Sequence, residues 1–316
     1  MDRRLKFRHI QCFLEAAKSR RLLDVALTLN ITQAAVSKTI TEMEQIVGLK
    51  LVRRDRSGVS LTPQGELFYH YAAAGMASFE KGLIGLSEQS SESVIELSIG
   101  VLPTVAARFM PNAIHALLQQ SNQAINIAFQ TGYNRDLYDL LHSGKIDLAI
   151  ARIGAPEMMY ELEFVHLYAE PIVLVSRSDH PILQLPAAGR ISAIHEFPFL
   201  LAPRATRIRP IIEQVFTTLS APFPKTCIET VSNTFGRSFL PQSDALWMIS
   251  YGVVEDLVSS GVLTVVAEPL DSTREPVGMV RRKDQQLDPA MRQLMSILML
   301  QTRELRPVNS KFAPEC

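Results

Sequence analysis

The sequence predicts three consecutive parts: a winged helix-turn-helix, a long connecting helix, and an α/β body. Apolar residues at helical spacing fill the first 47 positions, interrupted by a tight turn near Asn30. A second apolar stripe runs from Phe68 to Leu86 without a break. From Val94 onward, short strand-like runs alternate with helical patterns, which is typical of α/β domains.

The length and composition indicate more than one globular domain. The chain has 316 residues, of which 47% are hydrophobic and 20% charged. No apolar run approaches the roughly 18 residues that a membrane span requires. The N-terminus leads into an amphipathic pattern with no apolar signal region, so we expect a cytoplasmic protein without a membrane partner. Cys12, Cys227 and Cys316 are scattered, and we expect reduced thiols and no metal site.

Charge is unevenly distributed, although Lys and Arg equal Asp and Glu at 32 each. Residues 1–62 contain twelve basic and six acidic side chains, which leaves the remainder with an equal excess of acid. A basic head on an acidic body indicates a polyanionic partner for the head alone.

The first two helices are predicted from the spacing of their apolar residues. Phe7 to Ala17 places the first over about 6–19, and the second covers about 22–29. In the second helix we expect Leu23, Ala26 and Leu27 to point inward. Asn30 suits the left-handed turn that ends it.

A third helix is predicted to begin after Thr32, which is a favoured N-cap residue. Val36, Ile40 and Met43 belong to its packing stripe. The two helices flanking the Asn30 turn form a helix-turn-helix, whose second member commonly enters the major groove of DNA. Its early polar positions suit base edges and phosphates, although a solvated helix face is the alternative. These candidate DNA-binding residues are Thr32, Gln33, Ser37, Lys38 and Thr41.

A hairpin follows, with two short extended runs around Ser57 and Gly58 between residues 49 and 62. It carries Arg53, Arg54 and Arg56, which suit the DNA backbone or the minor groove. This pattern predicts a wing beside the third helix.

These 65 residues resemble, in order, the LysR-type transcriptional regulators. The matching segments are 7–13, 31–40, Glu44, Gly48, 51–54 and 61–65. Ala34 stands where the family usually has proline, at the helix start and away from its hydrogen-bonding face. The resemblance implies that the polar positions of the third helix contact the major groove, with the three arginines on the wing.

The connecting helix begins at Pro63, and its apolar stripe comprises Phe68, Ala72, Met76, Phe79, Leu83 and Leu86. The stripe could pack within its own chain. An antiparallel pairing between two copies explains better why the stripe lies between two domains. Such a pairing would present two DNA-binding domains to two DNA half-sites. We therefore expect a homodimer, and the resemblance adds a homotetramer.

The body is predicted to contain a parallel sheet with helices on both faces. Predicted strands cover 94–101, 125–129, 148–152, 172–176, 199–202, 227–230, 246–250, 263–266 and 277–281; helices cover 106–120, bent or interrupted at Pro111, and 134–143. The segments 99–109 and 144–150 resemble the effector domain of the same family. That resemblance implies two subdomains, as in periplasmic solute-binding proteins, with crossings near 168–172 and 270–276.

The resulting domain boundaries are 1–62 for the winged helix-turn-helix, 63–91 for the dimerisation helix, 92–304 for the effector domain and 305–316 for a tail. Subdomain I covers about 92–170 and 275–304, and subdomain II about 171–274.

Ligands of open α/β sheets bind where strands end and helices begin, so the loops at those positions define the predicted effector site. They offer cations and hydroxyls for carboxylates and one ring for an apolar body. The candidates are Thr104, Arg152, Arg204, Thr206, Asn233 and Phe235. Each alone could instead be a cap, a surface ion pair or core.

Several stretches, including 205–210 and 229–237, resemble the subgroup of the protocatechuate (pca) operon regulator. This implies a carboxylate from aromatic catabolism as effector, with a sugar or another metabolite as the alternative.

The sequence thus favours an effector-controlled transcription activator with RNA polymerase as a further partner. No catalytic residue or cofactor is expected, because the seven histidines are scattered and no nucleotide-binding glycine motif occurs. A free-standing solute-binding protein or an enzyme would not explain the basic head.

Overall fold

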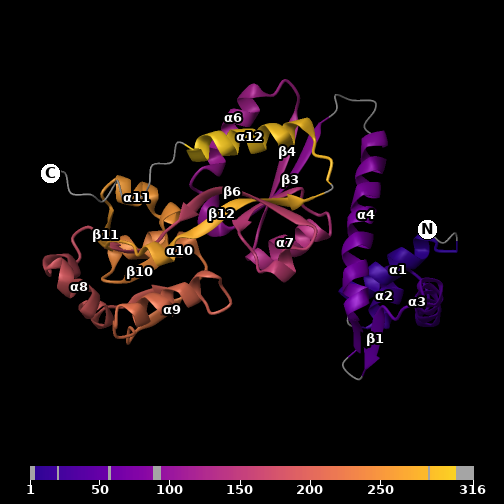
Figure 1. Ribbon diagram of the computed structural model, residues 1–316, viewed down its shortest axis with the longest axis horizontal. Coiled ribbons are helices and arrows are strands. Elements are labelled where there is room, and N and C mark those ends of the chain that lie inside the picture. Colours follow the sequence, from indigo (N-terminus) through magenta and orange to yellow (C-terminus); the bar gives the residue numbers. More distant parts are fainter. Residues whose placement is uncertain (1–3, 20, 56–57, 88–93, 284, 304–316) are drawn as a thin grey trace. The chain divides into compact units, whose positions relative to one another are not determined.

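The structure, a computed structural model, describes residues 4–19, 21–55, 58–87, 94–283 and 285–303 (Figure 1). The chain forms two compact units. The N-terminal unit comprises residues 1–93 together with the short segment 139–145, and the C-terminal unit comprises 94–138 and 146–316. The predicted tail at 305–316 lies outside the described residues.

The N-terminal unit has the predicted winged helix-turn-helix. Antiparallel pairing joins β1 to β2, with Arg54 opposite Val59. Asn30 has the left-handed backbone expected of it, with φ of 53°, and Gly48 ends α3 in the same region with φ of 76°. The elements are α1 (Phe7–Lys18), α2 (Leu22–Thr28), α3 (Gln33–Val47), β1 (Val52–Asp55), β2 (Gly58–Leu61) and α4 (Pro63–Ser87).

The core of this unit lies between α1, α2 and α3 and includes Phe13, Val25, Val36, Ile40 and Met43. The prediction for α2 was partly wrong: Ala26 is buried, whereas Leu23 and Leu27 are 54% and 69% exposed. Because α2 has only seven residues, it buries one narrow face, which carries the small side chains of Val25 and Ala26.

The stripe of α4 divides into two parts. Phe68, Ala72 and Met76 pack against the core of the same unit, and Phe68 meets Phe13 edge to face with ring centroids 5.3 Å apart. Phe79 and Leu83, further along, are 64% and 59% exposed. The side chain of Leu86 lies outside the described residues.

The C-terminal unit contains two five-stranded sheets, which define subdomains I and II. The strand order is β4-β3-β5-β12-β6 in subdomain I and β11-β7-β10-β8-β9 in subdomain II. Subdomain I comprises β3 (Ile95–Val101), α5 (Pro103–Ala106), α6 (Met110–Gln120), β4 (Ile125–Thr131), α7 (Asn134–His142), β5 (Leu148–Arg152), η1 (Pro156–Met159), β6 (Leu162–Glu170), β12 (Glu275–Arg282) and α12 (Pro289–Arg303). Subdomain II comprises β7 (Ile172–Arg177), η2 (Pro181–Gln184), α8 (Ala187–Ala193), η3 (Ile194–Glu196), β8 (Phe199–Leu201), α9 (Ile208–Thr218), β9 (Cys227–Glu229), α10 (Asn233–Phe239), η4 (Leu240–Gln242), β10 (Leu246–Ser250), η5 (Tyr251–Val253), α11 (Glu255–Ser259), β11 (Leu263–Ala267) and η6 (Asp271–Thr273).

The predicted parallel sheet is present only in part, because both sheets are mixed. β3 pairs in parallel with β4 and β5, but β12 runs antiparallel to β5 and β6. In subdomain II, β7 is antiparallel to both β10 and β11. The cause is the double crossing, since a chain that leaves and returns must bring one strand back in the opposite direction.

The two crossings occur where β6 passes into β7 at Pro171 and where β11 passes through η6 into β12. They are tied together, because Ile172 N donates to Thr273 Oγ1 at 3.4 Å and that hydroxyl donates to Leu270 O at 2.6 Å.

Of the two outcomes predicted for Pro111, the structure has an interruption and not a bend: α5 ends at Ala106, and α6 begins at Met110. Pro111 lies in the first turn of α6, where a backbone N–H would have no partner within the helix.

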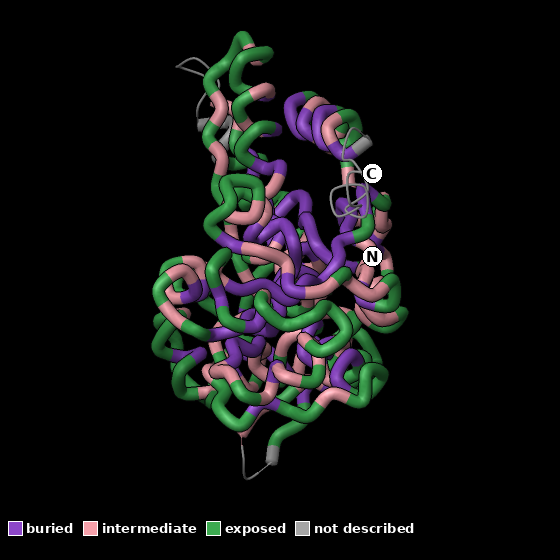
Figure 2. Tube along the Cα trace, turned by 90° about the vertical axis from the view of Figure 1, so that its left-hand side faces the viewer, coloured by how far each residue is buried: buried purple, intermediate pink, exposed green. Residues whose placement is uncertain are grey.

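Buried residues gather in the interior of the C-terminal unit, and the outer turns are largely exposed (Figure 2). Strands β5 and β10 are buried along their whole length. In the part of the chain that the structure describes, no helix combines the length and apolarity that crossing a membrane demands.

Candidate functional site

The start of α3 is capped as predicted, since Thr32 Oγ1 accepts a hydrogen bond from Ala35 N at 3.2 Å. The hydroxyl oxygen of Thr32 is therefore used within the helix, although the residue is exposed. Gln33 and Lys38 are exposed on the same helix, and Lys38 Nζ lies 3.9 Å from Glu42 Oε1. Gln33 and Lys38 thus keep side-chain donors free for an outside partner.

The wing and α3 meet at Ser37. Arg54 Nη1 of β1 donates to Ser37 Oγ at 2.8 Å, which brings together two residues predicted to contact DNA. Thr41, also half-buried, donates its hydroxyl to Ser37 O at 2.9 Å, so its proton serves the helix. Ser37 consequently fixes the position of Arg54, whose remaining N–H groups can still reach a phosphate.

Glu44 attaches the wing to the recognition helix. Its Oε1 accepts from Leu51 N at 2.9 Å and Val52 N at 3.1 Å, and its Oε2 accepts from Lys50 Nζ at 2.6 Å. Burial alone would raise the pKa of Glu44, but these three hydrogen bonds outweigh it and lower the pKa. The charged form of the Glu44 carboxylate therefore stabilises the folded state.

Arg53 lies exposed on β1, next to Arg54. Arg56, the third predicted wing arginine, lies outside the described residues. A helix edge with amide and ammonium donors, next to a hairpin with arginines, suits base edges and phosphates of duplex DNA.

A second candidate site is a cleft of about 520 Å³ within the C-terminal unit. It lies between the two subdomains, at the ends of β3, β4, β5, β8, β9 and β10. Four of the six predicted effector residues, Thr104, Arg152, Thr206 and Asn233, line it. The other two, Arg204 and Phe235, do not.

Arg152 is the buried cation of this cleft, with 2% of its surface exposed. Its Nη1 donates to Thr104 Oγ1 at 3.2 Å and its Nη2 to Ser250 Oγ at 2.8 Å. Among the described residues no carboxylate lies within ion-pair distance, and the buried Nε has no partner. Burial lowers the pKa of Arg152 from its ordinary value, with the charge of Glu170 opposing the shift. An arginine stays cationic even so.

The backbone of Arg152 is held by α7. Asn134 Nδ2 donates to Arg152 O at 2.8 Å, Arg152 N donates to Asn134 Oδ1 at 3.3 Å, and Tyr138 Oη donates to the same carbonyl. Burial raises the pKa of Tyr138 to about 12, so its hydroxyl remains a donor. The guanidinium therefore projects from a fixed backbone.

Besides the bond from Arg152 to Ser250, two contacts connect the walls of the cleft. Asn233 Nδ2 of subdomain II donates to Pro103 O of subdomain I at 2.8 Å. Arg207 Nε, before α9, donates to Glu275 Oε2 at 3.1 Å, at the start of β12. Thr206 directs its hydroxyl to Pro203 O in its own loop.

Arg204 and Phe235 fail to line the cleft for local reasons. Arg204 is exposed on the loop before α9, while Thr206 and Arg207 of that loop reach the cleft. Phe235 stacks on Phe239 one helical turn later, with ring centroids 5.2 Å apart and an interplanar angle of 13°. The helix that directs Asn233 across the cleft thus directs Phe235 elsewhere.

The cleft contains lining residues that the sequence reasoning missed, among them Tyr133, Arg135, Met158, Arg207 and Trp247. Arg207 sits three residues after Arg204, in a loop already identified as part of the site. Tyr133 and Arg135 flank the start of α7, immediately after the end of β4, where the same strand-end rule applies. Met158 lies in the short η1 helix, which no sequence pattern predicted.

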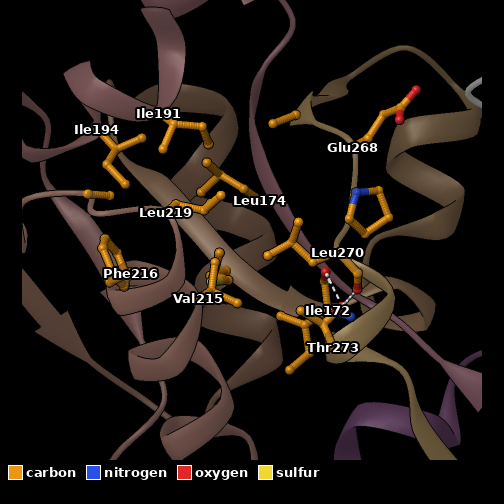
Figure 3. A pocket seen from close by; sticks show the side chains of 14 residues that line it. Ile172, Leu174, Ile191, Ile194, Val215, Phe216, Leu219, Glu268, Leu270 and Thr273 are labelled. Atoms are coloured by element: carbon orange, nitrogen blue, oxygen red, sulfur yellow. Dashed lines mark hydrogen bonds between the residues drawn. The ribbon is translucent and has the colours of Figure 1, made fainter. Parts of the chain in front are cut away.

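A further hollow lies within subdomain II, between α8, α9 and the sheet (Figure 3). Its lining is mostly aliphatic, and the hydrogen bonds between Thr273 and Ile172 lie at one end. With about 30 Å³ of space it has room for about one water molecule, not for an organic effector.

Comparison with known proteins gives a family match for each of the two parts of the chain. Residues 7–66 match the bacterial regulatory helix-turn-helix proteins of the lysR family, and residues 91–302 match the LysR substrate binding domain. The chain is 36% identical to the transcriptional regulator PcaQ of Agrobacterium fabrum over 96% of each chain. It is 30% identical to the uncharacterized regulator YdcI of Escherichia coli over 90% of this chain and 91% of that one. The structure of ArgP from Mycobacterium tuberculosis has the same fold, with a TM-score of 0.67, 16% identity and coverage of 95% and 98%. The chain therefore belongs to the LysR family of DNA-binding transcriptional regulators.

Proposed function

We propose that this regulator binds a small carboxylate in the cleft between its subdomains. In a dimer, this binding changes how the two DNA-binding domains contact an operator. The observation that carries the proposal is Arg152: a buried guanidinium that touches hydroxyls from both subdomains and no carboxylate among the described residues. A buried cation without a counter-ion is costly, and an anionic ligand would remove that cost.

The cleft favours an anion with an apolar or conjugated body. Arg135 adds positive charge, with Asp136 as an opposing carboxylate, and Arg207 adds a cation that is paired with Glu275. Met158 and Trp247 supply apolar surface. The resemblance to the pca regulator subgroup adds aromatic catabolism as the source of the carboxylate. A sugar, the second candidate, would use the hydroxyls and Asn233 but would leave Arg152 without a counter-charge.

Operator binding is assigned to α3 and the wing. Gln33, Ser37, Lys38 and Thr41 would face the major groove, with Thr32 at the helix start, and Arg53, Arg54 and Arg56 would contact the strand beside it. Ser37 and Thr41 would act partly by positioning, because their hydroxyls already bond Arg54 and the α3 backbone. These roles combine base readout with backbone contact.

Regulators of this family bind DNA and form oligomers. We assign dimerisation of this chain to α4, where Phe79 and Leu83 remain exposed on the second half of the stripe, although the Phe79 ring meets that of Phe7 with centroids 6.0 Å apart. Two such helices would bury these residues against each other. Pairing of dimers into tetramers, a cytoplasmic location and contact with RNA polymerase follow as further expectations.

We expect the ligand to bind with different affinities to two conformations that differ in the angle between the subdomains. Only such a difference in affinity can shift the equilibrium between them. A fluorescence anisotropy titration of the full-length protein against labelled DNA from upstream of its own gene tests the DNA half. We expect an affinity that falls steeply with salt, and a footprint that changes when a saturating carboxylate is added. Affinity for no upstream DNA would contradict the regulatory role, and an unchanged footprint while transcription still responds would contradict the mechanism.

A further inference from the structure

A second arginine, Arg108, lies at the junction of the two subdomains and outside the cleft lining. It follows α5 in subdomain I, and 4% of its side chain is exposed. Its Nη1 donates to Glu170 Oε2 at 3.1 Å, and its Nε donates to Glu255 Oε2 at 2.9 Å. Glu170 ends β6 at the first crossing, and Glu255 begins α11 in subdomain II. One guanidinium thus joins subdomain I, the crossing and subdomain II.

Aromatic rings and backbone close this cluster. The guanidinium carbon of Arg108 lies 5.1 Å from the ring centroid of Tyr168 and 5.7 Å from that of Tyr251. Gly252 N donates to the other Glu170 oxygen at 2.6 Å. A Cβ on Gly252 would meet Arg108 Cδ at 3.0 Å, so the absence of a side chain there lets the arginine approach.

The two carboxylates differ in how easily they can leave Arg108. Glu170 is fully buried, sits at the crossing and accepts a second hydrogen bond from Gly252, so it moves little when one subdomain turns relative to the other. Glu255 belongs to subdomain II, and its side chain is 24% exposed. Water can therefore replace Arg108 at Glu255 when subdomain II rotates, but not at Glu170.

We propose that Arg108 is a positioning residue that sets the angle between the subdomains, with Glu170 as its fixed contact and Glu255 as its breakable one. In this arrangement the Arg108–Glu255 pair stabilises the cleft geometry in which Arg152 bonds Ser250 and Asn233 bonds Pro103. Loss of the pair frees subdomain II to turn away and exposes the cleft. The inference requires no knowledge of the effector, because none of the three charged residues lines the cleft.

The molecule carries its own reporter of this opening. Trp247 is the single tryptophan of the chain, lines the cleft from subdomain II, and is 2% exposed. Residues 131–136 line the cleft from subdomain I, whereas Glu255 belongs to subdomain II. Opening of the cleft would expose Trp247 and give water more access to residues 131–136, of which Gly132 and Asn134 are half-buried. Local loosening of α11 would leave amide exchange in 131–136 unchanged.

The test uses the full-length protein as wild type, Glu255→Gln and Glu268→Gln. Glu268 is a matched control, because it is an exposed acid of the same subdomain whose side chain has no hydrogen bond or ion pair with the described residues. Acrylamide quenching of Trp247 and amide hydrogen exchange of residues 131–136 are measured well below the unfolding transition. We expect Glu255→Gln to raise the quenching constant about twofold or more and to speed exchange in 131–136. Glu268→Gln should match wild type in both.

Arg108→Lys serves as a second variant, because lysine keeps the charge but cannot bond both carboxylates in the forked geometry of arginine. Arg108→Lys should also raise the quenching constant of Trp247 and speed amide exchange in 131–136. If Glu255→Gln does not fold, the result for Arg108→Lys decides whether the inference holds. The inference is overturned if quenching and exchange in Glu255→Gln equal those of Glu268→Gln, or if Arg108→Lys leaves both at wild-type values. Faster exchange confined to 250–259 would likewise overturn it.

Discussion

Arg152 and Ser250 bond each other across the cleft, with Nη2 of the arginine 2.8 Å from Oγ of the serine. The arginine ends β5 of subdomain I, and the serine ends β10 of subdomain II. A ligand that takes the donors of Arg152 therefore acts directly on a contact between the two subdomains. Binding and subdomain geometry are linked at this one side chain.

Replacement of Arg152 by glutamine should abolish the carboxylate response and leave operator affinity unchanged. A hydrogen bond to a charged group contributes about 1.5–3 kcal/mol, so we expect carboxylate affinity to fall roughly ten- to a hundredfold. Arg204→Gln is the control, because it removes the same charge outside the cleft lining. Calorimetric titration and operator anisotropy measure the two properties, and equal losses in both variants would refute the assignment.

Replacement of Arg54 and of Gln33 by alanine should weaken DNA binding in different ways. Arg54→Ala removes a phosphate contact, so binding should fall on all sequences, and the slope of log affinity against log salt should decrease by about one. Gln33→Ala should instead reduce the ratio of the affinity for the operator to the affinity for unrelated DNA. Anisotropy titrations on both DNAs at several salt concentrations distinguish them. A sequence-dependent loss for Arg54→Ala would contradict its predicted role.

Glu44→Ala should destabilise the N-terminal unit, because it leaves the buried N–H groups of Leu51 and Val52 without an acceptor. Each unsatisfied group costs about 1–3 kcal/mol. Denaturant unfolding followed by circular dichroism measures the loss. Glu15→Ala, which removes an ion pair with Lys18 on α1, is the control and should cost less than about 1 kcal/mol.

The stability of the N-terminal unit should depend on the charge of Glu44 at acid pH. Folding lowers the pKa of Glu44 below its ordinary value of 4.5, so the folded state favours the charged form. Its stabilising effect is complete above that ordinary value and is lost as the pH falls through the lowered pKa. Glu44→Gln should therefore flatten the decline in unfolding midpoint as the pH falls below the ordinary pKa of 4.5. A parallel decline in the variant would show that other carboxylates dominate.

A glutamate at Phe79 or Leu83 should reduce dimer formation. Both side chains are exposed on α4, and a charge there would have to be buried in the proposed helix pairing. Light scattering after gel filtration should show a lower mass for each variant than for wild type. Glu80→Gln, an exposed neighbour, is the control. A wild-type mass in both Phe79→Glu and Leu83→Glu would place dimerisation elsewhere.

The local sequence pattern predicted the positions of helices and strands better than it predicted the direction of a strand or the face that a helix buries. Strands 148–152 and 246–250 were predicted with their observed limits, because a continuous buried apolar run between polar loops marks a strand. The antiparallel return of β12 was not predictable in this way, because its partner β6 precedes it by more than a hundred residues and was itself missed. Leu23 and Leu27 fit a helical stripe, but the face that α2 buries is decided by α3.

The cleft could be located from the sequence, but its lining could not be fully assigned. Strand-end loops correctly brought together Thr104, Arg152, Thr206 and Asn233. Within one loop, however, the start of α9 determines that Arg207 reaches the cleft and Arg204 does not. That choice depends on a few backbone angles, which residue type does not reveal.

The most direct test of the account is calorimetric titration of full-length wild type and Arg152→Gln with a panel of small mono-, di- and tricarboxylates and neutral sugars. We expect at least one carboxylate to bind wild type, the same compound to bind Arg152→Gln roughly ten- to a hundredfold more weakly, and no sugar to bind as tightly. Tight binding of a sugar alone, or equal carboxylate binding by both proteins, would contradict it.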